Sequence, residues 1–200
     1  MPNQFAYNPR ARRYRDIETG KFVSAKAVRS AVDQVIDVES GKLRELASKF
    51  TQGKISFAEW QLQSMAQIKA LHVSMALAAN GGINSTSPSD LGYIGNLIKQ
   101  QYQFFRNMAK DIRQGRQALD GTLLARVGLY AQSARRTYEQ VVKRAAKNGG
   151  AEEERRLLGA ADHCAACAGE ARKSWQAIGT LLMIGDTPCR GNCRCRFDYR

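Results

Sequence analysis

The chain has 200 residues, of which 44% are hydrophobic and 24% charged, enough for one mid-sized domain with short additions. Its 31 lysines and arginines against 18 acidic residues give a formal net charge of +13. No stretch approaches eighteen uninterrupted apolar residues, so neither a membrane-spanning helix nor a membrane partner is expected. The charge indicates a polyanionic partner, an acidic protein surface or a nucleic-acid-rich setting, and does not choose among them.

Residues 1–23 predict a basic extended arm. Residues 14–16 and 21–23 flank a four-residue segment that ends in Gly20, which can supply the positive φ of a tight turn, so a small hairpin is expected within the arm. The arginines of the arm are interleaved with tyrosines and are candidate nucleic-acid or partner contacts, although a solvated terminus is the commoner meaning of such a segment. These four candidates are Arg10, Arg12, Arg13 and Arg15.

Residues 24–150 predict an elongated helical body, because apolar residues recur there at helical spacing. Ser24 is the expected N-cap of a first helix that reaches about residue 51, with a candidate kink at residues 40–41. Ser56 and Glu59 form a capping box for a second helix, which Asn80 and the two glycines after it end. His72 lies in the apolar run of this helix and is expected to be a core histidine.

Two further helices complete the body. The third is expected from Ser89 or Asp90 to about Ile112, and the fourth from about Thr122 to Lys147. A short fifth helix over residues 151–162 and a final strand over 193–199 belong to the next segment. The fold class predicted is therefore mainly α, with four to five helices and a small C-terminal module at residues 151–200.

That module contains every cysteine of the chain. They are Cys164, Cys167, Cys189, Cys193 and Cys195, in the pattern C-x2-C, 21 residues, C-x3-C-x-C. Two short cysteine pairs separated by a loop are the usual arrangement for a tetrahedral zinc ion. The sequence thus predicts a zinc-knuckle-like module that holds a structural Zn²⁺.

The fourth zinc ligand is less determined than the first three. Cys164, Cys167 and Cys189 are the firmest candidates, and Cys193 is the expected fourth, with Cys195 or His163 as the alternative. Cys193 and Cys195 should point to opposite faces of an extended segment, so both are not expected to bind one ion. For His163 a local hydrogen bond or surface role is expected before ligation.

Two other meanings of the cysteines are weaker. Disulfides are typical of secreted chains, and the polar, basic first residues lack the apolar core of a signal peptide. A redox C-x-x-C usually follows a strand in a βαβ unit, whereas Cys164 follows a segment expected to be helical. Three arginines lie among the last cysteines, where a rigid knuckle would hold them as phosphate or partner contacts: Arg190, Arg194 and Arg196.

The C-terminal residues resemble those of a known family, the tailed-bacteriophage head-morphogenesis proteins of the Mu F-like class, which are minor head or minor capsid proteins. Many members of that class end in a similar Asn-Cys-Arg-Cys segment. The resemblance is specific over the C-terminal third to half of the chain. The matching residues are Arg155-Arg156-Leu157-Leu158-Gly159, Asp162-His163-Cys164-x-x-Cys167, Trp175, Ile178-Gly179-Thr180-Leu181, Gly185, Cys189 and Asn192-Cys193-Arg194-Cys195.

The resemblance implies a non-enzymatic virion protein, assembled in the host cytoplasm and located near the portal or neck. Its implied partners are portal or other head and neck proteins, further copies of itself in a ring, and packaged DNA. The alternative is a zinc-containing DNA-binding regulatory protein. An enzyme is the least favoured class, because no P-loop, nucleophile motif or diagnostic carboxylate pair is present.

Overall fold

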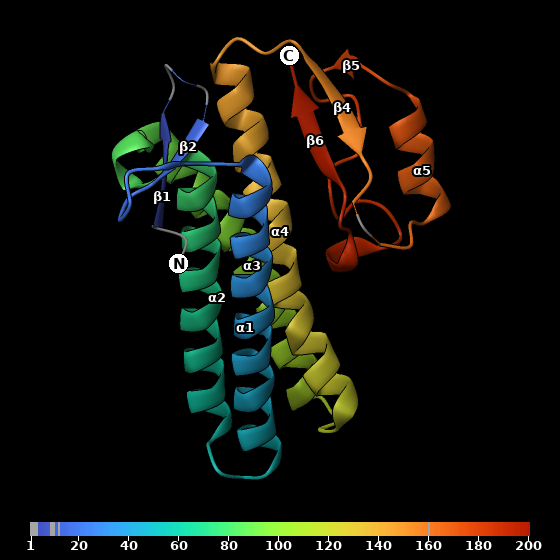
Figure 1. Ribbon diagram of the computed structural model, residues 1–200. Coiled ribbons are helices and arrows are strands. Elements are labelled where there is room, and N and C mark those ends of the chain that lie inside the picture. The colour runs from blue at the N-terminus through green and yellow to red at the C-terminus, as the bar shows by residue number, and fades with distance from the viewer. Residues whose placement is uncertain (1–3, 9–10, 12, 160) are drawn as a thin grey trace.

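The computed structural model describes residues 4–8, 11, 13–159 and 161–200. It is mainly helical, at 63%, with five α-helices and a Cys-rich cluster at the C-terminal end, which confirms the predicted fold class. Four long helices form the body, one small sheet covers an end of it, and a second sheet with the shortest helix lies beside it (Figure 1). Within the described residues no helix is both long and apolar enough to cross a membrane.

The first two helices begin at the caps that the sequence predicts. Helix α1 (Ala25–Thr51) starts after Ser24, whose side chain accepts a hydrogen bond from the N–H of Ala27, and it continues through residues 40–41 without a break. Helix α2 (Phe57–Asn80) starts with the Ser56–Glu59 capping box and ends at Gly81, which has φ 80°. A 3₁₀ turn, η2 (Ile83–Ser85), leads to the next helix.

Helices α3 and α4 are each slightly longer than predicted. Helix α3 (Pro88–Arg113) begins after Ser87, which forms a second capping box with Asp90, so the cap lies before the residues expected to supply it. Helix α4 (Gly121–Asn148) is capped by the Asp120 side chain. Helix α4 contacts each of the other three long helices, and it is the element against which both halves of the molecule pack.

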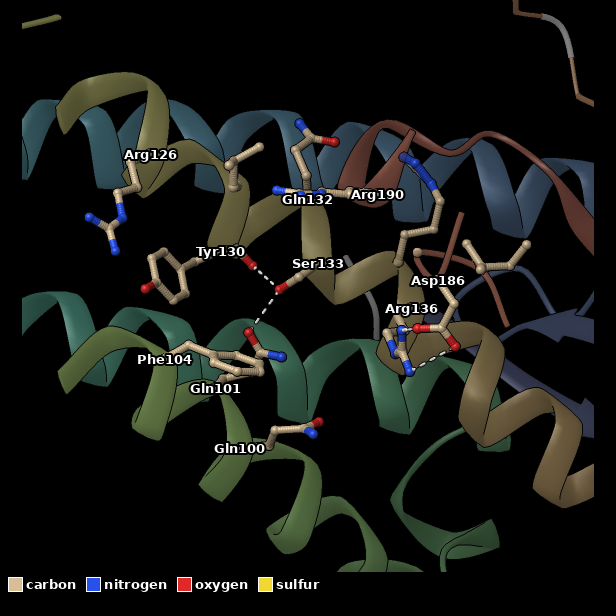
Figure 2. A pocket seen from close by; sticks show the side chains of 15 residues that line it. Gln100, Gln101, Phe104, Arg126, Tyr130, Gln132, Ser133, Arg136, Asp186 and Arg190 are labelled. Atoms are coloured by element: carbon tan, nitrogen blue, oxygen red, sulfur yellow. Dashed lines mark hydrogen bonds and ion pairs between the residues drawn. The ribbon is translucent and has the colours of Figure 1, made fainter. Parts of the chain in front are cut away.

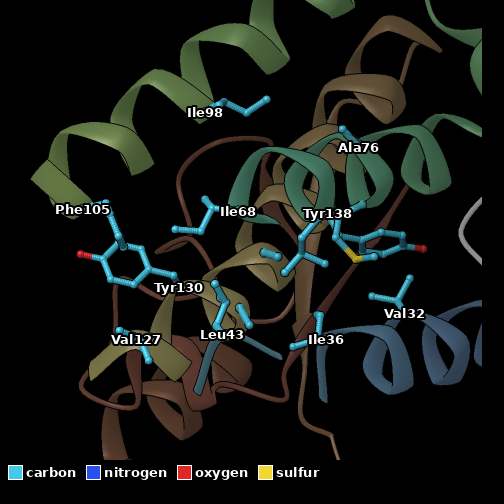
Figure 3. Close-up of a cluster of buried hydrophobic side chains, with 14 of the residues drawn as sticks. Val32, Ile36, Leu43, Ile68, Ala76, Ile98, Phe105, Val127, Tyr130 and Tyr138 are labelled. Atoms are coloured by element: carbon cyan, nitrogen blue, oxygen red, sulfur yellow. The ribbon is translucent and has the colours of Figure 1, made fainter. Parts of the chain in front are cut away.

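The core of the body lies between α1, α2, α3 and α4. Apolar side chains from all four helices meet there, among them Ile36, Ile68, Ile98 and Val127 (Figure 3). Near one end Trp60 is fully buried, 5.1 Å from the ring centroids of both Phe50 and Phe105. Such aromatic packing adds to the free energy gained from burial alone. The stripes of helical periodicity therefore form one continuous core.

The N-terminal segment forms a sheet instead of an extended arm. Strands β1 (Phe5–Asn8), β2 (Arg13–Asp16) and β3 (Phe22–Val23) pair antiparallel in the order β1-β2-β3, and the predicted hairpin joins the last two. Phe5 is 6% exposed, and the Tyr14 hydroxyl donates to the carbonyl of Ala79 at the end of α2. Burial of an apolar anchor and this hydrogen bond hold the sheet on the body.

The segment expected as a fifth helix, residues 151–162, contains a strand instead. Strand β4 (Glu153–Leu157) is the centre of a second sheet, paired antiparallel with β5 (Gln176–Ala177) and with β6 (Arg196–Tyr199). Its inward side chains are Glu154 and Arg156, both almost fully buried. The prediction was wrong because charged residues occupy the buried face, so the alternation of a half-buried strand does not appear in the hydrophobic pattern. The final strand is present as expected.

Candidate metal centre

The cysteines reach one place from two separate turns. Cys164 is the N-cap of helix α5 (Ala165–Arg172), which puts Cys167 in the first helical turn. Cys189 and Cys193 flank the 3₁₀ turn η3 (Arg190–Asn192), and Cys195 directly precedes β6. All five thiols are free, so the disulfide alternative finds no support. Each turn thus brings its sulfurs to one side of the module.

The spacing between the sulfurs fits a tetrahedral zinc site. Cys164 Sγ lies 3.7 Å from Cys189 Sγ, and Cys167 Sγ lies 3.4 Å from Cys189 Sγ and 3.7 Å from Cys193 Sγ. Zinc–sulfur bonds of about 2.3 Å at tetrahedral angles separate the sulfurs by about 3.8 Å. Cys164, Cys167 and Cys189 form one group of mutually close sulfurs, and Cys167, Cys193 and Cys195 form a second. These residues fit a divalent metal ion that prefers thiolate ligands, such as zinc.

The last two cysteines do not point to opposite faces as the sequence suggested. Both are buried, at 2% exposure, and both lie close to Cys167. Cys193 is the C-cap of η3, and the regular strand begins only at Arg196, so the two-residue alternation of a strand does not apply between them. His163 Nδ1 is 3.6 Å from Cys195 Sγ, while its Nε2 is 2.8 Å from the carbonyl oxygen of Gly159. Cys195 and His163 therefore form a pair next to the main group.

A buried arginine and a threonine surround the shared sulfur. Cys167 is fully buried and accepts a hydrogen bond from Arg156 Nη1 at 3.3 Å. Arg156 also donates to the carbonyl of Leu182, and its guanidinium lies 5.3 Å from the Phe197 ring centroid. The Thr187 hydroxyl is 3.3 Å from Cys167 Sγ and 3.2 Å from Cys189 Sγ. Such outer contacts orient metal ligands and disperse thiolate charge.

The pKa values of the cysteine thiols indicate that the cluster cannot be fully ionised by itself. The backbone N–H of Cys167 lowers the pKa of the Cys164 thiol to about 7, whereas burial raises the pKa of Cys167 to about 12. Several sulfurs packed this closely cannot all ionise without a compensating cation. A bound divalent metal supplies that compensation and deprotonates its cysteine ligands.

The module is fixed to the body along α4. Lys143 Nζ on α4 lies 2.8 Å from Glu154 Oε2 on β4, and Glu154 also accepts hydrogen bonds from the N–H groups of Gly179 and Leu181. Gly191 faces Gln132 so closely that an added Cβ would lie 2.9 Å from the Gln132 Cβ. A buried ion pair and a close backbone approach thus set the position of the cysteines relative to the helices.

The predicted contact arginines are distributed over three places. Arg10 and Arg12 lie outside the described residues. Arg13 and Arg15 are exposed on β2, each with its guanidinium 4.9 Å from the Phe22 ring centroid. Arg190 is exposed beside α4, and Arg194 and Arg196 line a separate cavity between the module and α1. The structure therefore does not gather the described arginines of this set, residues 13, 15, 190, 194 and 196, into one basic surface.

Arg190 lies on a groove of about 580 Å³ between α3, α4 and the module (Figure 2). Phe104, 51% exposed, and Leu129, 45% exposed, give it an apolar part. Arg136 on α4 pairs with Asp186 of the module across one end of the groove. Ser133 joins the two helices by donating to Gln101 Oε1 at 3.0 Å. The groove is thus a half-apolar surface with arginines at its edge.

Several residues at these sites were not predicted from the sequence. Arg156 and Thr187 contact the sulfurs, and Glu154 joins the module to the body. Arg156 lies in a segment that resembles the phage family but was given no role there, and Glu154 and Thr187 belong to no motif. In the sequence pattern, Glu154 and Arg156 appear only as an acidic and a basic residue two positions apart, which an exposed helix also shows, and Thr187 gives no signal. His72 is fully buried, 2.7 Å from the Thr137 hydroxyl, which confirms its prediction as a core residue.

No family model, curated protein or solved structure matches the chain.

Proposed function

We propose that this chain is a non-enzymatic structural protein of a tailed-phage particle, a minor head component located near the portal or neck. A structural Zn²⁺ held by Cys164, Cys167, Cys189 and Cys193 fixes its C-terminal module on the helical body. The proposal includes head or neck proteins as partners, several copies in a ring, and packaged DNA next to the basic surfaces. Its localisation is the virion, after assembly in the host cytoplasm.

The observation that carries the metal part is the sulfur spacing. Three sulfur pairs lie at 3.4–3.7 Å, close to the separation that one zinc ion imposes, and all five cysteines remain free thiols. The phage assignment is supported by the resemblance of the segments around these same cysteines. The net charge of +13 suits a protein that works beside densely packed DNA.

A structural role for the metal is favoured by the surroundings of the sulfurs. A catalytic zinc needs an open position and a nearby general base. Glu170 follows the C-x-x-C pair closely, but its carboxylate already binds Lys173 Nζ at 2.5 Å and the N–H of Leu182 at 3.0 Å. Asp162, the other nearby acid, is exposed. Glu170, the acid that is held next to the C-x-x-C pair, is thus already occupied by structural partners.

The direct test is protein mass spectrometry of purified phage particles released by a strain that carries this coding sequence. The proposal expects the chain in every preparation, at low copy number relative to the major capsid protein. Its consistent absence from particles would contradict the assignment. Gel-shift titration of the isolated chain with duplex DNA tests the alternative, a zinc-containing DNA-binding regulatory protein. Such a regulator binds duplex DNA tightly, with a steep dependence on salt concentration.

A further inference from the structure

A second cavity, of about 680 Å³, lies between the helical body and the module. Residues of α1 form one wall, Arg135 and Glu139 of α4 form another, and residues 158–159 and 194–196 close it from the module side. Its volume falls within the range of about 300–1,000 Å³ typical of small-ligand sites. The cavity is separate from the sulfur cluster, although Cys195 touches both.

The charges around the cavity favour an anion. Five cationic side chains line it against three carboxyl groups. Burial raises the pKa of the Glu139 carboxyl to about 7, so this group is only partly ionised near neutral pH. The cations come from three separate segments, and their positive field converges on one space. The charged lining residues are Lys26, Arg29, Arg135, Arg194 and Arg196, with Asp33, Asp37 and Glu139.

Two guanidinium groups in this lining have donors without acceptors. Arg135 is 5% exposed, and although its Nη2 pairs with Asp33 at 2.5 Å, its Nη1 is buried and has no hydrogen-bond partner among the described residues. Nε of Arg29 is likewise buried without an acceptor in that part of the chain. A buried charged donor without an acceptor is costly, so such groups generally mark a bound water or ion.

We propose that this cavity binds a phosphate group, with the free donor atoms of Arg135 and Arg29 as its inner contacts. Arg194 contributes charge from the module and Lys26 from α1. Tetrahedral oxyanions match guanidinium donors well, because several oxygens can accept hydrogen bonds at once. Bound there, the phosphate joins α1 and α4 to the module. The phosphate is either free inorganic phosphate or a backbone phosphate of nucleic acid.

The carboxylates that line the cavity do not neutralise its arginines. Asp33 accepts from Arg135 and lies 3.7 Å from Arg194, so one carboxylate is shared by two guanidinium groups. The side chain of Asp33 is also 42% exposed, which weakens its pairing with both. The lining therefore carries more positive charge than its own carboxylates neutralise.

The test is a titration of the full, zinc-loaded chain with inorganic phosphate, at constant ionic strength and after free metal has been removed. Backbone amide shifts in ¹H–¹⁵N NMR spectra report the binding site. We expect saturable shifts at residues of α1, α4 and 194–196, and about tenfold weaker binding in each of Arg194→Gln and Lys26→Gln. Arg106→Gln removes the same charge from an exposed position on α3 outside the cavity, and it should leave the affinity unchanged.

The outcomes separate the possibilities. Competition between phosphate and a short single-stranded oligonucleotide for the same shifts identifies the backbone phosphate of nucleic acid, and lack of competition identifies free phosphate. Shifts that do not saturate, or that weaken equally in Arg106→Gln, would overturn the proposal in favour of general charge attraction. Both cavity variants must retain zinc for the comparison to hold, and Lys26→Gln lies far in sequence from every cysteine. Absence of the chain from phage particles would leave this result untouched.

Discussion

The helical body and the Cys-rich module stabilise themselves by different means. The body contains a cluster of 22 buried hydrophobic residues shared among four long helices. The module has only six buried residues in its cluster, and three of them are Cys167, Cys193 and Cys195. A segment with so few apolar side chains gains little from the hydrophobic effect and generally needs a metal or covalent links. The comparison indicates that burial stabilises the body, and we propose that the module, with its small core, depends on a metal ion held by its clustered cysteines.

The largest expected effect is removal of the shared sulfur. Cys167→Ser should abolish tight zinc binding and unfold residues 151–200, because structural zinc sites contribute about 10–16 kcal/mol of apparent binding free energy to the folding of small modules. The long helices should persist. Hydrogen exchange read by mass spectrometry measures both regions at once. Loss of protection throughout the body would contradict the independence of the two regions.

A substitution in the helical core should destabilise the body and leave the module unaffected. Phe105 is fully buried against Trp60 and Tyr130, so Phe105→Ala should lower the free energy of unfolding of the body by about 3–5 kcal/mol. Denaturation followed by circular dichroism measures this loss. Zinc content should remain that of the native chain at low denaturant concentration, and a matched exposed substitution, Phe104→Ala, should cost far less.

A smaller effect depends on pH through His72. Burial lowers the pKa of His72 from 6.5 to about 4, so the unfolded chain binds the proton more readily than the folded chain. Stability is therefore unaffected above pH 6.5, and it falls between pH 6.5 and 4, by up to about 3 kcal/mol. Acidification would also release a zinc ion bound by the cysteines, so the measurement is the difference between the native chain and His72→Gln. An identical acid dependence in both would exclude this histidine as the cause.

The smallest expected effect is at a helix cap. The Ser56 hydroxyl accepts from the N–H of Glu59, and Ser56→Ala should reduce the stability of the body by about 1 kcal/mol. The module should keep its zinc affinity. Chemical denaturation provides the measurement, with Ser30→Ala, at an exposed position inside α1, as the control. Equal costs for both substitutions would show that the cap adds nothing.

The two regions also differ in how far the sequence predicts them. In the body, caps such as Ser24 and Ser56 and a regular apolar period locate the helices to within a few residues, because burial follows hydrophobicity there. In the module, the inward residues Glu154 and Arg156 are charged and are satisfied only by partners distant in sequence. Local pattern contains no information on such partners, so the strand was predicted as a helix.

The candidate metal centre also has a part that the sequence predicts and a part that depends on the tertiary fold. Cysteine spacing correctly brings Cys164, Cys167 and Cys189 together, because that expectation depends only on two short turns and a loop. The positions of Cys193 and Cys195 depend on where η3 ends and β6 begins, which the sequence does not specify. The second cavity was not predicted, since it joins residues of α1, α4 and the module that only the tertiary fold brings together.

The most direct test of metal binding by the module is the metal content of the purified 200-residue chain, measured by native mass spectrometry together with elemental analysis. We expect one zinc ion per chain, lost in Cys167→Ser and retained in Phe105→Ala. A chain that purifies without bound metal, takes up none when zinc is added, and still shows a protected module by hydrogen exchange would contradict this expectation.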